Sequence, residues 1–157
     1  MCDYSPRSIR NRLAEEGEEL VLHRFETGSL GFASASDLDE CEEASEKISS
    51  SVWTVLKDWL LLPRHAARVP PICVPPGAQL LLSDIPVNVQ TSLCIRSSEL
   101  AVFTELHARS YRFRSALLLP NATRVLLQDF PEGLHALVLS MSSDTSSKEQ
   151  PAAVRAC

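Results

Sequence analysis

The apolar positions in the second half of the chain come in short runs, and Pro, Gly, Asn or Asp separates each run from the next. Short runs bounded by turn-forming residues are typical of β-strands. We expect strands at 20–25, 30–34, 72–74, 78–83, 92–96, 100–106, 111–119, 124–130 and 134–141. The short connections favour antiparallel neighbours. The pattern therefore predicts a mainly β protein, a small antiparallel barrel or a two-layer sandwich of about eight strands.

One segment breaks this β pattern. Between residues 37 and 62, apolar or small residues recur at alternating intervals of three and four, which keeps them on one stripe of a helix. Ser36 and Asp39 form a capping box of the carboxylate type, and Pro63 ends the pattern. We expect a helical insertion at 37–62 within a single β-rich domain, residues 1–141, and a disordered tail at 142–157.

The second half of the predicted helix has a broad apolar face that includes Trp53 and Trp59, the only two tryptophans of the chain. Two interpretations stay open. The face packs on the chain's own sheet, or the helix at 37–62 is the surface for a protein partner or a second copy. In the second case the acidic residues at 37–47 would steer a basic partner.

The distribution of charge along the chain limits the classes of partner that we expect it to bind. The formal net charge is −5, and residues 37–47 carry that whole excess with six acids and one lysine. No basic footprint for nucleic acid or an anionic membrane is present in the sequence. No apolar signal segment follows the first arginines, and the most apolar stretch, 59–62, is too short to cross a bilayer. We expect a cytoplasmic protein that binds neither nucleic acid nor membrane.

The five cysteines lack C-x-x-C spacing. In a reducing compartment we expect Cys73 and Cys94 to be buried as small apolar residues, and Cys41 and Cys157 to be surface thiols.

Cys2 is the sharpest candidate for chemistry. Removal of Met1 would leave a free α-amine and a thiol on one residue, which can act together as base and nucleophile. The alternative is a tolerated thiol near a docked terminus. Cys2, Cys73 and His23 could instead hold a transition metal, although their spacing fits no strong ligand motif. His23 equally fits a structural histidine within a strand.

Arg112 and Arg114 are predicted to lie on one face of a strand, where they could grip a phosphate or carboxylate. The alternative is a charged, solvated face that prevents pairing at a sheet edge.

Three stretches, M-C-D-Y-S at the start, N-R-L-A-E-E-G-E-E-L and I-C-V-P-P-G, resemble a group of short uncharacterised bacterial proteins. Those proteins begin in the same way and carry a similar Cys before a Pro-Gly turn. The likeness covers the first 35 residues and the β-rich part, whereas residues 36–69 look like an added segment. No activity is established for that group, so the resemblance implies no site. It does direct attention to Cys2 and Cys73, which could share a metal or a redox bond.

Together these observations predict a small binding or accessory protein without catalytic activity. The alternative is a cysteine-based site centred on Cys2, which acts with Cys73 in metal binding or redox chemistry, or alone as an amino-terminal thiol nucleophile.

Overall fold

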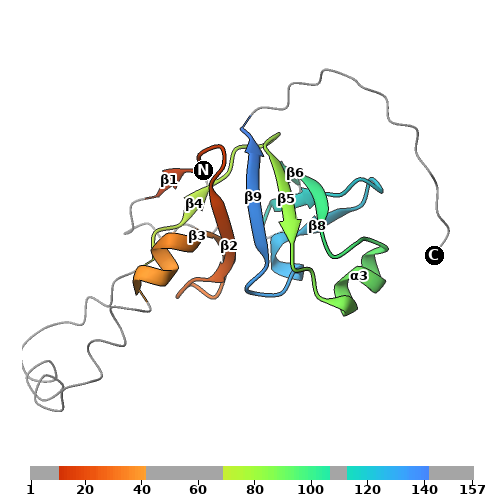
Figure 1. Cartoon of the computed structure of the whole chain (residues 1–157), viewed down its shortest axis with the longest axis horizontal. Helices are drawn as coiled ribbons and strands as arrows, with labels where there is room; N and C mark the ends of the chain where they lie inside the picture. Colours follow the sequence, from red (N-terminus) through yellow and green to blue (C-terminus); the bar gives the residue numbers. More distant parts are fainter. Residues whose placement is uncertain (1–10, 42–68, 107–112, 142–157) are drawn as a thin grey trace, which may run out of the picture.

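The computed structural model describes residues 11–41, 69–106 and 113–141. Within these residues the chain is mainly β, and nine strands form one mixed sheet that is not closed into a barrel (Figure 1). The mainly β prediction is confirmed in its sandwich-like form. The strands are β1 (Arg12–Leu13), β2 (Glu19–Arg24), β3 (Leu30–Ser34), β4 (Ile72–Cys73), β5 (Gln79–Ser83), β6 (Glu99–Glu105), β7 (Ser115–Leu118), β8 (Arg124–Leu126) and β9 (His135–Ser140).

The last strand holds the two halves of the sheet together. The strand order is β1-β4-β3-β2-β9-β5-β6-β7-β8, so β9 lies between β2 and β5 and pairs with both in antiparallel orientation. In Figure 1, β9 runs between β2 and its neighbours on one side and β5 to β8 on the other. The fold therefore depends on contacts between the two ends of the described chain.

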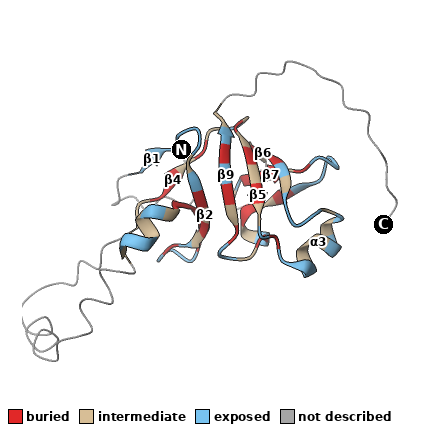
Figure 2. Ribbon diagram, in the orientation of Figure 1, coloured by how far each residue is buried: buried red, intermediate tan, exposed pale blue. Residues whose placement is uncertain are grey.

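The core lies on the inner face of this curved sheet. Alternate residues of β2, β5 and β9 are buried there, as Figure 2 shows by the buried segments of these strands. Phe32 and Phe103 meet across the interior with ring centroids 6.4 Å apart. Burial of each large apolar side chain contributes about 1.5–3 kcal/mol. The alternation that predicted these strands is thus the alternation that fills the core.

A side chain brings the β8 end of the sheet back to β3. The 3-10 turn η1 (Leu127–Asp129) directly follows β8 and contacts β3. Gln128 accepts a hydrogen bond from the Leu30 backbone N–H at 2.9 Å and donates one to the Leu30 carbonyl at 2.8 Å. The sheet curls without a closing ladder of strand pairs, which explains the open, sandwich-like form.

The predicted strand at 92–96 is wrong, because α3 (Val87–Leu93) covers its first two residues and residues 94–96 form no strand. Pro86 precedes the helix, and Val89 and Leu93, four residues apart, pack partly against the core. Val and Thr are weak helix formers. Here tertiary packing of one helix face overrides their preference for strands.

Two further corrections concern strand ends and direction. β1 was not predicted, and it pairs with β4 in parallel orientation, whereas only antiparallel neighbours were expected. The predicted strand at 124–130 ends at Leu126 and continues as η1. The strand predicted at 111–119 covers only Ser115–Leu118 among the described residues.

Residues 35–41 are helical, which agrees with the start of the predicted insertion. The rest of the segment, including Trp53 and Trp59, lies outside the described residues, as does the tail at 142–157. Within the described part of the chain, no helix combines the length and apolar character needed to cross a bilayer.

Candidate functional site

A cleft of about 530 Å³ lies between the turn that precedes β2 and the start of the helix at 35–41. Five carboxylate residues line it, namely Glu15, Glu16, Glu18, Glu19 and Asp39. One cationic side chain, Arg12, also lines it. The lining therefore carries a formal charge of −4 when all six side chains are ionised (−5 + 1).

Backbone bonds fix the turn on one side of the cleft. The Glu18 N–H donates to the Glu15 carbonyl at 3.1 Å, and the Gly17 N–H donates to the Val138 carbonyl of β9 at 2.8 Å. Gly17 has φ +81°, a left-handed conformation that glycine adopts without a steric cost. The turn is thus pinned to the central strand of the sheet.

The other side of the cleft is formed where β3 leads directly into the helix at 35–41. β3 ends at Ser34 and the helix begins at the next residue, Ala35. The hydroxyls of Ser34 and Ser36 lie 2.9 Å apart and are hydrogen-bonded. The first acidic residues of the 37–47 segment therefore lie beside the turn at 15–18.

An ion pair between Arg12 and Glu18 forms the centre of the site. Two guanidinium nitrogens of Arg12 donate to the two oxygens of Glu18, and the bond to Oε2 is 3.0 Å long. The Glu15 backbone N–H donates to the same Oε2 at 2.9 Å. Arg12 also lies 3.9 Å from Oδ2 of Asp37. A bidentate pair with a further donor is held in one geometry.

The contacts between Arg12 and Glu18 shift the pKa values of both side chains. The hydrogen bond with Glu18 is the largest cause of the raised pKa of Arg12. Burial, the largest single effect on Glu18, would raise its pKa. The hydrogen bonds from Arg12, the Glu15 N–H and Ser34, together with the charge of Arg12, outweigh burial, so the pKa of Glu18 lies below its ordinary value. Glu18 is therefore held as a carboxylate.

The other carboxylates of the cleft differ in their hydrogen-bond and ion-pair partners. Glu16 accepts a hydrogen bond from the Met141 backbone N–H at 3.0 Å, and Oε1 of Glu19 lies 3.0 Å from Nδ1 of His135. Within the described ranges, no hydrogen bond or ion pair engages the carboxylates of Glu15 and Asp39. These two groups are exposed and remain available to a ligand.

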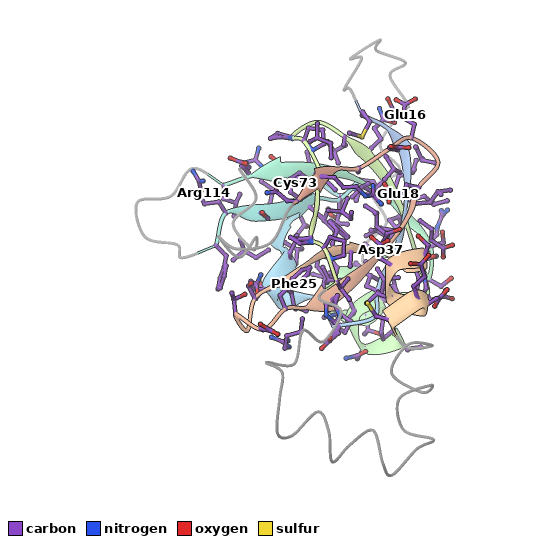
Figure 3. The ribbon with its side chains drawn as sticks, turned by 90° about the vertical axis from the view of Figure 1, so that its left-hand side faces the viewer. Glu16, Glu18, Phe25, Asp37, Cys73 and Arg114 are labelled. Carbon is purple, nitrogen blue, oxygen red and sulfur yellow. The ribbon has the colours of Figure 1, made fainter. Side chains whose placement is uncertain are left out.

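Figure 3 shows Glu16, Glu18 and Asp37 on one side of the domain, and Arg114 on the opposite side. Arg114 is exposed, and its carbonyl accepts the Leu106 N–H at 2.8 Å. Arg112 lies outside the described residues, so the predicted arginine pair remains a prediction.

His23 and Cys73, two of the three residues proposed from the sequence as metal ligands, do not line this cleft. His23 packs edge-on against Phe25 with ring centroids 5.2 Å apart, and its Nδ1 lies 3.7 Å from Oε1 of Glu132. In the part of the chain that the structure describes, no group of three or more His, Cys, Asp or Glu residues is placed to hold a metal ion. Cys2 lies outside the described residues, so its proposed role remains a prediction.

Cys73 and Cys94 are both disulfide-bonded. The expectation that they are buried, reduced thiols is wrong, and Cys94 is exposed at the end of α3. A disulfide-bonded sulfur has no thiolate to offer a metal. Cys41 keeps its thiol, outside any disulfide, and is partly buried.

Sequence reasoning missed the turn side of the cleft. The sequence predicted no role for Arg12 or for the four glutamates at 15–19. The available signal was E-E-G-E-E, in which two pairs of acids flank a glycine. A glycine in that setting marks a turn, and a turn places the flanking acids close together.

Comparison with protein-family models, with curated proteins and with solved structures gives no match for this chain.

Proposed function

We propose that this chain is a non-catalytic binding or accessory protein, and that its ligand is a basic peptide segment held in the cleft beside Arg12 and Glu18. One observation carries the proposal. Five carboxylates and a single guanidinium line one cleft, and that guanidinium is already paired with Glu18. Charge complementarity of this kind guides and orients a cationic partner.

The distribution of the carboxylates favours an extended ligand over a single ion. Glu15 and Asp39 lie on opposite sides of the cleft, one on the turn and the other on the helix. Lysine and arginine side chains reach separate carboxylates through long, flexible stems. A peptide with several basic residues can therefore engage both sides of the cleft at once.

The state of Glu18 supports binding over acid–base catalysis. A catalytic carboxylic acid needs a raised pKa so that it still carries a proton near neutral pH. The pKa of Glu18 is instead lowered, because Arg12, the Glu15 N–H and Ser34 outweigh the opposing effect of burial. The Arg12–Glu18 pair thus acts as a fixed support for the cleft.

Calorimetric titration of the full-length chain with a ten-residue Lys/Arg-rich peptide tests the proposal. We expect binding that weakens with added salt, because exposed charges are screened. The double variant Glu15→Gln/Asp39→Asn should weaken binding by about tenfold, since two partly exposed charge pairs contribute about 1.4 kcal/mol together.

The control variant Glu26→Gln/Asp129→Asn removes the same charge at exposed positions outside the cleft lining. It should leave the affinity within about twofold, less than one exposed charge pair contributes. Equal losses in the two double variants would show that net charge, and not the cleft, attracts the peptide.

A redox role for Cys73 is the second candidate, because Cys73 is disulfide-bonded. This fits the redox form of the cysteine-based alternative, whose other proposed member, Cys2, lies outside the described residues. Disulfide bonds at Cys73 and Cys94 favour an oxidising compartment over the cytoplasm expected from the sequence. Peptide mapping without reduction would identify the partner of Cys73, and a partner other than Cys2 would exclude this candidate.

A further inference from the structure

Cys73 and Cys94 are both disulfide-bonded, but their places in the fold keep them from bonding to each other. Cys73 is in β4, which lies beside β3 and β1, whereas Cys94 ends α3 in the connection from β5 to β6. Figure 1 shows β4 and α3 on opposite sides of the domain. A disulfide joins residues whose Cα atoms are less than about 7 Å apart. Each of the two cysteines therefore has a different partner.

The cysteine content of the chain leaves two candidates for these partners. The chain has five cysteines, and Cys41 keeps its thiol. The other two are Cys2 and Cys157, which lie outside the described residues. Since two disulfides need two partners, one bond includes Cys2 and the other includes Cys157.

The position of β1 favours Cys2 as the partner of Cys73. Leu13 in β1 is opposite Cys73, and the Ala14 N–H donates to the Cys73 carbonyl at 3.0 Å. Leu13 follows Cys2 by only 11 positions (13 − 2), and a short loop costs little entropy to close. The sequence therefore returns Cys2 to the side of the domain on which Cys73 lies.

Cys157 has the reach that the second bond needs. It follows Met141, the last described residue, by 16 positions (157 − 141). An extended segment of that length spans about 55 Å, more than the roughly 30 Å across a small domain. Cys157 can therefore bond to Cys94 at the end of α3.

The strand beside Cys73 is weakly held by its backbone pairing alone. β1 consists of two exposed residues, Arg12 and Leu13. Its neighbour β4 is equally short and, within the described residues, pairs with β3 through Ile72 and Phe32. An exposed element with so few contacts opens locally at a low free energy. A covalent bond from Cys73 to the segment that precedes β1 would limit this opening.

We propose that the chain has two disulfides, Cys2–Cys73 and Cys94–Cys157, and that the first is a redox-sensitive clamp on β1. A dithiol reductant supplies two electrons and two protons, so that the bond between Cys2 and Cys73 becomes two thiols and the reductant becomes a disulfide. β1 then opens more often, and so does the pair between Arg12 and Glu18. The clamp acts on the fold itself and does not depend on a bound peptide.

Peptide mapping of the full-length chain without reduction tests the pairing. Trypsin alone leaves Cys73 and Cys94 together in residues 69–96, so a second protease must cleave before Asp84. We expect one linked pair of peptides with Cys2 and Cys73, and another with Cys94 and Cys157. A bond between Cys73 and Cys94, the opposite pairing, or thiols at Cys2 and Cys157 would overturn the proposal.

Hydrogen exchange of single amides tests the clamp. In Cys2→Ser, or after wild type is treated with dithiothreitol, the Ala14 amide should exchange about tenfold faster or more, because β1 opens locally. The Leu22 amide, which donates to the Leu134 carbonyl at 2.9 Å, is the internal control and should keep its rate.

Cys157→Ser is the matched control, because it removes the other disulfide and should leave the Ala14 rate unchanged. An Ala14 rate that Cys2→Ser does not raise, or that both variants raise equally, would overturn the clamp. Equal acceleration at Leu22 in Cys2→Ser would also overturn it, because the bond would then support the whole fold instead of β1.

Discussion

The side-chain amide of Gln128 pairs with the backbone of Leu30 as a neighbouring strand would. Its oxygen accepts from the Leu30 N–H at 2.9 Å, and its nitrogen donates to the Leu30 carbonyl at 2.8 Å. Leu30 as a whole is 1% exposed. One side chain therefore satisfies two backbone groups at the place where the curled sheet does not close.

Replacing Gln128 should destabilise the fold. In Gln128→Ala both Leu30 groups lose their partner, and an unsatisfied buried polar group costs about 1–3 kcal/mol. We expect the free energy of unfolding to fall by about 2–4 kcal/mol, measured by urea denaturation. Gln128→Glu keeps the acceptor but places a carboxylate oxygen against the Leu30 carbonyl, so it should also lower the free energy of unfolding.

Asp129→Ala, at the exposed neighbour in the same turn, should change stability by less than about 0.5 kcal/mol. Equal losses for Gln128→Ala and Asp129→Ala would mean that the amide pairing does not stabilise the sheet.

The Arg12–Glu18 pair should make stability depend on acid pH. The pKa of Glu18 is lowered in the folded chain, because the hydrogen bonds and charge around it outweigh burial. Its contribution is complete above the unfolded pKa of about 4.3 and is lost as pH falls through the folded pKa. Glu18→Gln should cost about 1–2 kcal/mol near pH 7, a value reduced by the partial exposure of Arg12.

Urea denaturation of wild type and Glu18→Gln at several pH values measures this effect. The difference between the two should shrink steadily below about pH 4.3. A difference that stays constant down to pH 2.5, well below that reference pKa, would show that the change acts through packing instead of charge. Glu132→Gln, at a more exposed carboxylate paired with Arg24, should cost less at every pH.

Replacing Ala122 by glycine should raise the stability of the fold. It has φ +63° in the turn between β7 and β8, and its N–H donates to the Leu119 carbonyl at 2.9 Å. A left-handed conformation is unfavourable by about 1 kcal/mol for alanine, and glycine, which has no Cβ, avoids this strain. We expect Ala122→Gly to raise the melting temperature by a few degrees. Gly133→Ala, at φ +84°, should lower it by a similar amount, with no steric clash to add. A lower melting temperature for Ala122→Gly, or a higher one for Gly133→Ala, would contradict the left-handed conformation at these two positions.

The cysteines should differ in reactivity. Alkylation of the oxidised protein, followed by mass spectrometry of peptides, should modify Cys41 and leave Cys73 and Cys94 unmodified. After reduction under denaturing conditions, all three should react. Modification of Cys73 before reduction would contradict the disulfide.

Periodicity predicted most of the sheet because burial follows it. The alternation in β2 and β9 places Leu20 and Ala136, which pair with each other, in the core. The same reasoning failed at the end of α3, where Leu93, within the predicted strand 92–96, is the last residue of a helix and packs against the core. It also missed β1, since a two-residue strand has no alternation to detect.

The candidate site was only half visible in the sequence. The acidic run at 37–47 was recognised, and it was expected to steer a basic partner only if the helix at 37–62 were a docking surface. Its convergence with Glu15 and Glu18 depends on β3 leading directly into a helix and on Gly17 bonding to Val138, 121 residues away (138 − 17). No local pattern encodes a contact of that separation, so the cleft follows only from the sheet order.

Mapping the bound peptide by backbone amide chemical shifts tests the central claim most directly. On adding the Lys/Arg-rich peptide to the ¹⁵N-labelled full-length chain, the amides of residues 15–19 and 35–39 should shift most. The amides of β8 and of Arg114, on the opposite side of the domain from Glu18 (Figure 3), should stay in place. Shifts centred on β8 or α3, or no shifts at millimolar peptide, would contradict a basic-ligand site in the cleft.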